Sequence, residues 1–273
     1  MTHQKNLFLI LLLIPYALYA IHDPTTIGAR SISMGNISVV GTDFHSLYHN
    51  QAAMAYYGKS SVGLDYDQGF FADKNLSTKS VGAIINTGIG SLGVQMKYFG
   101  FQLYNEQKVG LAYGRKLGKY LAIGVQLDYF RTYIGQDYGN AQALSFEIGF
   151  YSKLSEKLEL GAHILNPIGM TIGNEFKESL PIGFKFGLLY HIDENLLIAC
   201  EVEKTLTEKA IYKFGLEYLI SNYFSVRTGL STQPTLFSFG MGLNLQKWHL
   251  DVGTAYHQNL GFTPRISLYF NFD

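Results

Sequence analysis

Fourteen segments of alternating apolar and polar residues occupy most of this chain, from about residue 59 to residue 272. In residues 92–98, for example, the order is Leu-Gly-Val-Gln-Met-Lys-Tyr. Alternation with a period of two puts all apolar side chains on one face of a strand. The segments reach about ten residues, whereas strands in soluble sheets usually have about five or six. The pattern predicts an all-β fold, a transmembrane antiparallel β-barrel of about 14 strands.

The first twenty residues have the features of an export signal. Lys5 supplies a positive charge, an apolar run covers residues 7–14, and the small residue Ala20 follows. The run is too short for a helix that crosses a bilayer, which needs about 20 apolar residues. We therefore expect residues 1–20 to be a signal peptide that is cleaved after Ala20.

Composition and aromatic placement favour a membrane barrel over a secreted soluble sandwich, which is the alternative. Charged residues make up only 15% of the chain, against about 25% in soluble domains. Tyrosines stand at the ends of several segments, among them Tyr98, Tyr129 and Tyr218, as expected at membrane interfaces. No apolar run after residue 20 is long enough for a helical span. With 21 basic and 21 acidic residues, nothing points to a nucleic-acid partner.

The links between segments predict the orientation of the barrel. Links after even-numbered segments are short, as in Asp193-Glu194 and Gln246-Lys247, whereas several odd links are longer, notably 68–76, 99–106, 132–140 and 165–179. Outer-membrane barrels have short periplasmic turns and long external loops. An even strand number then places both termini in the periplasm of a bacterial cell.

Two stretches carry a family resemblance. The first reads GARSISMGNISVV over residues 28–40 and continues through Asp43 to NQAAMA over residues 50–55. The second is Asn166-Pro167-Ile168-Gly169. Together they resemble the PorV/PorQ proteins, a branch of the FadL-like outer-membrane barrels of Bacteroidetes. In that family Pro is usual at the position of Gln51, so the match departs from the pattern there.

The resemblance implies that residues 21–58 form a small N-terminal hatch inside the lumen of a barrel formed by residues 59–273. A lumen of fourteen strands is too wide for side chains alone to fill, which agrees with a hatch. Candidate residues for hatch packing are Ala29, Arg30, Met34, Gly35, Asp43 and Asn50, and those for the loop motif are Asn166, Pro167 and Gly169. Arg30, Asp43 and Asn50 either anchor the hatch or contact a ligand, and the sequence leaves both open. Asn50 is a suitable N-cap for a short helix.

The polar face of the strands carries both signs of charge, including Asp65, Lys97, Glu147, Lys185 and Arg227. A strongly selective ion pore would favour one sign. We therefore expect these side chains to pair with one another and with the hatch.

Enzymatic motifs are scarce. His45 and His49 are four residues apart, but no third metal ligand is evident, and no G-x-S-x-G motif occurs. We expect a protein that is not an enzyme, with no catalytic residues, no cofactor and no metal. The lone cysteine, Cys200, lies among apolar residues and is expected to face lipid.

Three functions remain open. The resemblance implies an accessory barrel for type IX secretion or surface assembly, with a translocon or secreted surface proteins as partners. The alternative is FadL-like passage of a hydrophobic small molecule, and the third is a mainly structural barrel in outer-membrane lipid. Aromatic residues predicted in loops suit the first two, namely Phe70, Phe71, Phe99, Phe101 and Tyr104. A tunnel past the hatch with a strand kink would favour transport, whereas a sealed lumen with an exposed aromatic patch would favour docking.

Overall fold

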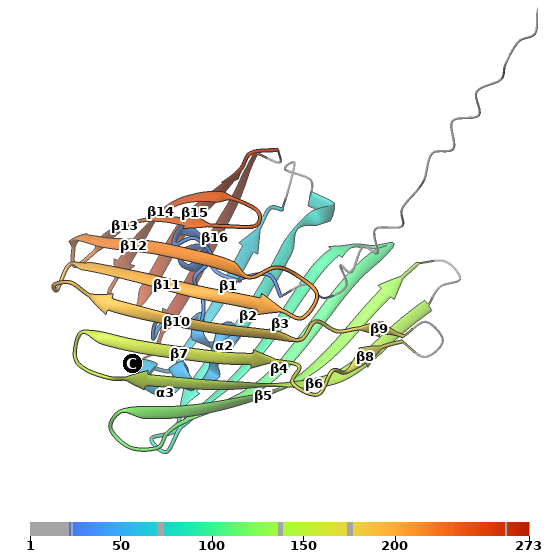
Figure 1. The fold of residues 1–273 in the computed structure, drawn as a ribbon, viewed down its shortest axis with the longest axis horizontal. Coiled ribbons are helices and arrows are strands. Elements are labelled where there is room, and N and C mark those ends of the chain that lie inside the picture. The colour runs from blue at the N-terminus through green and yellow to red at the C-terminus, as the bar shows by residue number, and fades with distance from the viewer. Residues whose placement is uncertain are drawn as a thin grey trace, which may run out of the picture.

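Within the residues that the computed structural model describes (22, 24–69, 74–135, 139–173, 177–259 and 261–272), fourteen strands close into one antiparallel barrel (Figure 1). Each barrel strand pairs with the next barrel strand along the chain, with β7 paired to β10, and β16 closes the barrel on β1. The prediction of a barrel of about 14 strands is confirmed. The predicted signal peptide, residues 1–20, lies outside the described residues.

The barrel strands are β1 (Ser61–Asp67), β2 (Thr78–Asn86), β3 (Ser91–Phe101), β4 (Tyr104–Lys116), β5 (Leu121–Ile134), β6 (Gly139–Lys153), β7 (Leu158–Leu165), β10 (Gly183–His191), β11 (Leu196–Thr205), β12 (Ile211–Ser221), β13 (Phe224–Ser231), β14 (Leu236–Leu245), β15 (Trp248–His257) and β16 (Gly261–Asn271). A separate two-stranded sheet, β8 (Thr171–Ile172) with β9 (Glu178–Ser179), lies in the link between β7 and β10.

The barrel has an apolar exterior and a polar interior. On β14, Phe237 and Phe239 are more than half exposed, whereas Ser238 between them is fully buried. Cys200 lies on the outward side, because its neighbour Glu201 is buried inside. A soluble sandwich would bury its apolar face, so that alternative is wrong, and the exterior requires lipid.

Two of the long links predicted from the sequence, 99–106 and 132–140, are shorter in the structure, so the predicted strand ends are wrong there. Strands β3 and β4 continue to Phe101 and from Tyr104, so that only residues 102–103 join them. Cross-strand pairing continues into the expected loop, with Phe99 opposite Glu106. In the same way β5 and β6 extend to Ile134 and from Gly139. Ladder hydrogen bonds satisfy the backbone there, although the apolar alternation has already weakened.

Within the described residues, the segment before β1 lies in the lumen and forms three short helices, α1 (Ala29–Ser33), α2 (Ser46–His49) and α3 (Gln51–Tyr57). The apolar core lies between this segment and the wall, with Phe44, Leu47 and Met54 packed near Ile84 and Tyr269. None of the helices in the described residues is long and apolar enough to cross a membrane. Figure 1 places α3 and the C-terminus at the end of the barrel where the short links lie.

Candidate functional site

Glycines in the barrel wall let the backbone of the luminal segment lie directly against the strands. A Cβ on Gly229 would lie less than 3.0 Å from Gly35, and one on Gly240 would meet the Ser33 hydroxyl in the same way. These glycines face each other across neighbouring strands and form a belt: Gly63–Gly82, Gly114–Gly124–Gly149, Gly161–Gly187, Gly215–Gly229 and Gly240–Gly253. The described part of the predicted hatch, His22 with residues 24–58, lies against the wall at this glycine belt, and we keep the name hatch for it.

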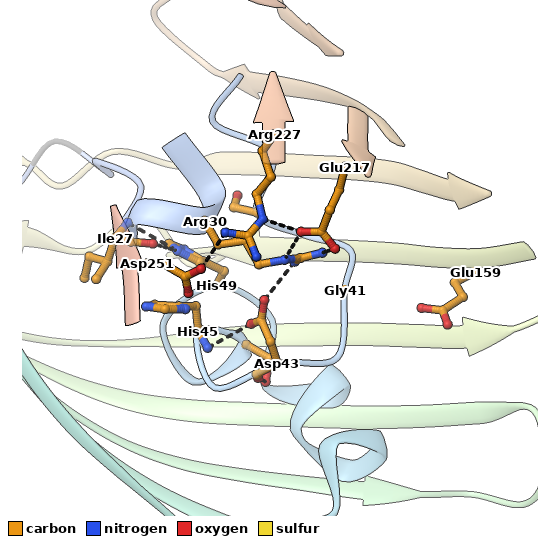
Figure 2. Close-up of polar contacts among 12 residues, drawn as sticks. Ile27, Arg30, Gly41, Asp43, His45, His49, Glu159, Glu217, Arg227 and Asp251 are labelled. Atoms are coloured by element: carbon orange, nitrogen blue, oxygen red, sulfur yellow. Dashed lines mark hydrogen bonds and ion pairs between the residues drawn. The ribbon is translucent and has the colours of Figure 1, made fainter. Parts of the chain in front are cut away.

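An ion-pair chain ties the hatch to the wall (Figure 2). Arg30 Nη1 lies 2.8 Å from Asp43 Oδ2, and Arg30 Nε lies 2.9 Å from Glu217 Oε2 on β12. Arg227 on β13 binds the same Glu217, and its Nη1 lies 2.5 Å from Asp251 Oδ1 on β15. Burial opposes ionisation of Asp43, but the Arg30 guanidinium holds the pKa of this carboxyl below its usual range. Acidic and basic side chains alternate along this series of ion pairs, so each buried charge has a partner of opposite sign.

Glu201 on β11 makes a second anchor in the middle of the hatch. Its carboxylate accepts hydrogen bonds from the backbone amides of Ser38 (2.6 Å) and Val39 (2.7 Å). Lys213 on β12 lies 2.7 Å from Glu201 and donates to the Asn36 carbonyl. Two backbone amides and one lysine thus satisfy the carboxylate of Glu201, a residue that is only 2% exposed.

His45 anchors the hatch to β1. Its Nε2 lies 2.8 Å from Asp65 Oδ1, and the Ser267 hydroxyl donates to the same oxygen while accepting from the Ala29 amide. Burial opposes protonation, but Asp65 and then Asp43 raise the pKa of His45 to about 9. The ring is therefore charged at neutral pH.

The neighbouring His49 behaves in the opposite way. Burial, reinforced by Lys185, lowers the pKa of His49 well below its ordinary value. Its Nε2 faces the backbone of Ile27, and it does not share a site with His45. In the described ranges no group of three His, Cys, Asp or Glu side chains is arranged to hold a metal.

Asn50 and Gln51 join the start of α3 to the wall. Asn50 caps the helix through its side chain, which accepts from the Ala52 amide, and its Nδ2 donates to the Val39 carbonyl. Gln51 stands at the first helical position, where Pro is favoured. Its Nε2 instead donates to Glu147 on β6 at 2.8 Å. Glutamine at this position thus makes a polar contact to the wall that proline could not make.

The remaining predicted hatch residues pack without charge. The Ala29 amide donates to Ser267, Met34 is 3% exposed against Gly215, and Gly35 has a φ of 72° where it meets β13.

Asn166 fixes the link that carries β8 and β9. Its side chain accepts from the Met170 amide at 2.9 Å and from the Ser145 hydroxyl at 2.9 Å, and it donates to the Leu180 carbonyl at 3.0 Å. Pro167 and Gly169 complete the turn, and Gly169 has a φ of 66°. The link packs Ile172 and Leu180 on Phe130 of β5. The sequence motif therefore belongs to the cover of a cavity beside the hatch.

A cavity of about 70 Å³ lies between the hatch, the wall and this link. Its lining is mixed. Phe130, Ile27 and Leu180 are apolar, while other positions carry charge or hydrogen-bonding groups: His22, Lys97, Glu106, Lys108, Glu147, His163 and Lys185. No motif in the sequence singles out His22, Glu106 or Phe130. The sequence could have indicated the cavity residues of β4 and β5 only through strand alternation, which places four of them on the inward side: Glu106, Lys108, Phe130 and Thr132.

Among the described strands the ladder shows one irregularity, between Leu219 and Ser221. It lies at the end of β12 next to the short link to β13. The wall beside the cavity is regularly paired from β3 to β6, and no strand kink is seen there. On the other side of the cavity, β7 pairs with β6 only between Glu147 and Lys153, so residues 139–146 of β6 extend past the end of that ladder.

No protein-family model and no curated protein matches the chain. Solved structures match in fold. The P. putida toluene transporter TodX has a TM-score of 0.71 at 12% identity, over 92% of this chain and 99% of that chain. The CymD monoaromatic hydrocarbon channel has a TM-score of 0.70 at 12% identity, over 93% and 99%. A Pseudomonas aeruginosa FadL homologue has a TM-score of 0.61 at 12% identity, over 91% and 98%.

At these identities the likeness shows the fold alone, which is a closed barrel of the FadL and TodX type. The matches give no specific support to the PorV/PorQ branch that the sequence motifs resemble.

Proposed function

We propose that this protein is a bacterial outer-membrane channel for small hydrophobic molecules and that the hatch is its gate. The proposal takes up the alternative from the sequence and gives the protein no catalytic step, no cofactor and no metal. It rests on the barrel type, which it shares with a toluene transporter and a monoaromatic hydrocarbon channel. The apolar exterior supports residence in outer-membrane lipid, and the short links support periplasmic termini.

The observation that carries the proposal is the cavity beside the hatch. An apolar cavity of roughly 150 Å³ holds benzene, whereas this one measures about 70 Å³. A ring-sized molecule therefore enters only when part of the lining moves. Residues 24–27 of the hatch are the candidates, because Pro24, Thr25 and Ile27 line the cavity and precede the ion-paired helix α1.

Uptake by whole cells tests this proposal, because a lipopolysaccharide leaflet resists hydrophobic solutes that pass freely through phospholipid vesicles. The barrel is expressed in a Gram-negative host without its own hydrocarbon channel, and the uptake rate of radiolabelled toluene is measured. We expect faster uptake than in vector-only cells. Equal rates at equal surface expression would refute the proposal.

An accessory role in secretion remains the second candidate, and one observation favours it. The tip of the β3–β4 hairpin exposes Phe101 (38%) and Leu103 (57%), which suits contact with another protein. Phe99 and Tyr104 lie in the strands, and Phe70 and Phe71 lie outside the described residues. Affinity isolation from the native membrane in mild detergent distinguishes the two. Stoichiometric recovery of a translocon or secreted protein would support docking, whereas recovery of the barrel with a bound hydrophobe would support passage.

A further inference from the structure

We propose that the cavity wall contains a subsite for an aromatic ring that bears a hydrogen-bonding group, and that the His22 ring occupies this subsite in the closed state. The inference rests on the proposed function and specifies its substrate class: phenols and azoles are accepted in preference to plain hydrocarbons.

The subsite is built from two cross-strand pairs on β4 and β5. Lys108 lies opposite Phe130, and Glu106 lies opposite Thr132. Glu106, Phe130 and Thr132 are each at most 7% exposed. The four side chains offer a cation, an aromatic face, a carboxylate and a hydroxyl, and the Lys108 ammonium lies 5.5 Å from the centre of the Phe130 ring. A patch of this kind matches a ring that has both an apolar body and a polar edge.

His22 fills this patch as a ligand would. Its ring meets Phe130 edge-on with 4.9 Å between ring centres. Its Nε2 lies 3.0 Å from Thr132 Oγ1, and its backbone amide donates to Glu106 Oε2 at 2.9 Å. The residue is 7% exposed although it precedes the first helix of the hatch. One apolar contact and one ring-edge hydrogen bond are what a bound phenol would need.

The state of the ring agrees with this role. Burial, together with Lys97 and Lys108, lowers the pKa of His22 to about 3. The side chain is therefore a neutral heteroaromatic ring, held by packing and by one hydrogen bond to Thr132. A neutral external ring can replace it without moving a charge into the cavity.

A hydrocarbon ring could match only part of these contacts. Toluene has the size of phenol, but it cannot replace the hydrogen bond between His22 and Thr132. A buried hydroxyl that loses its partner is costly, and sites that bond a substrate hydroxyl discriminate against analogues that lack it. The geometry therefore predicts a preference that a purely apolar channel would not show.

The test compares the wild-type barrel with His22→Ala and His22→Phe in detergent, with phenol and toluene as probes and calorimetry or ligand-observed NMR as the readout. His22→Ala empties the subsite and should tighten phenol binding about 30-fold, the combined worth of one hydrogen bond and one aromatic pair. Phenol should then bind about fivefold tighter than toluene, and Thr132→Val in that background should abolish this preference. His22→Phe keeps the subsite filled and should show no gain.

His257→Ala serves as the matched control, since His257 lies at the end of β15 and outside the cavity lining. Heat-modifiable migration in gels confirms that each variant forms a barrel. Equal affinity for toluene and phenol in His22→Ala, or no gain for either, would overturn the subsite. The toluene uptake assay decides the proposed function separately: uptake without phenol preference leaves a hydrocarbon channel, and phenol binding without uptake leaves a subsite that serves no passage.

Discussion

Glu217→Gln should loosen the hatch. Glu217 lies between two guanidinium groups, those of Arg30 in the hatch and Arg227 in the wall. The glutamine has nearly the same shape and keeps one acceptor oxygen, but it carries no charge. Arg30 then depends on Asp43, which belongs to the hatch itself.

The magnitude follows from the burial of the pair. Glu217 and Arg30 have side chains that are 9% and 16% exposed, so solvent screens their attraction only weakly. Hydrogen bonds to charged groups contribute about 1.5–3 kcal/mol each, and the introduced amide would still accept one weaker bond. We expect the hatch to lose about 2–3 kcal/mol of docking free energy, which corresponds to a roughly 30- to 150-fold larger undocked population.

Hydrogen exchange measures this population directly. Amides of α1 should exchange faster by that factor, while amides of β4–β6, which lie elsewhere in the ladder, should keep wild-type rates. Glu156→Gln, in the exposed link between β6 and β7, is the matched control. A change below about threefold in α1, or an equal rise in all strands, would show that the ion-pair chain does not hold the hatch.

Three further predictions concern the same assembly. Stability from the His45–Asp65 pair should be fully present below pH 6.5 and disappear as the pH rises through about 9, because His45 has a raised pKa. Exchange of hatch amides, corrected for intrinsic rates, should therefore rise over this range, and His45→Gln should abolish the dependence. Gly240→Val should prevent Ser33 from seating and raise protease cleavage of the hatch, while the outward-facing substitution Thr228→Val should not. Asn166→Ala should cost about 2–4 kcal/mol in docking of the β8–β9 link, since three or more hydrogen bonds are lost, and exchange at Leu180 will measure it.

The fold could be predicted because its cause is local. Alternation such as that of Phe237, Ser238 and Phe239 gives every strand one apolar face, and the same rule repeats around the barrel. Strand ends were less predictable. In β3 and β4 the backbone pairing of Phe99 with Glu106 continues the ladder after the apolar alternation has ended, and the side-chain pattern says nothing about such bonds.

The site could be predicted only in part, because its contacts join residues far apart in the chain. The family motif pointed to Arg30, Asp43 and Asn50, but their wall partners, such as Glu217 and Glu201, could not be chosen among many inward-facing charges. The position of His22 against β4 and β5 depends on how the whole hatch is placed inside the lumen. That placement follows from the glycine belt. The sequence shows that these glycines alternate with the apolar, outward-facing residues, but it does not show which hatch residues pack against them.

The distribution of anchors along the hatch determines which part of it can move most easily. From Ala29 to Gln51 the hatch is held by the ion-pair chain, by Glu201, by Asp65 and by Glu147, and its backbone rests on the glycine belt. Releasing all of these together would cost many kcal/mol, since each buried charged contact contributes about 1.5–3 kcal/mol. In the described residues before Ala29 the polar contacts are neutral or single charged hydrogen bonds, such as those of Thr25 with Lys97 and of Thr26 with Arg265. In the proposed channel, movement of this first part alone would enlarge the cavity at the His22 seat while the rest of the hatch still fills the lumen. A ring-sized molecule would then enter without release of the ion-pair chain.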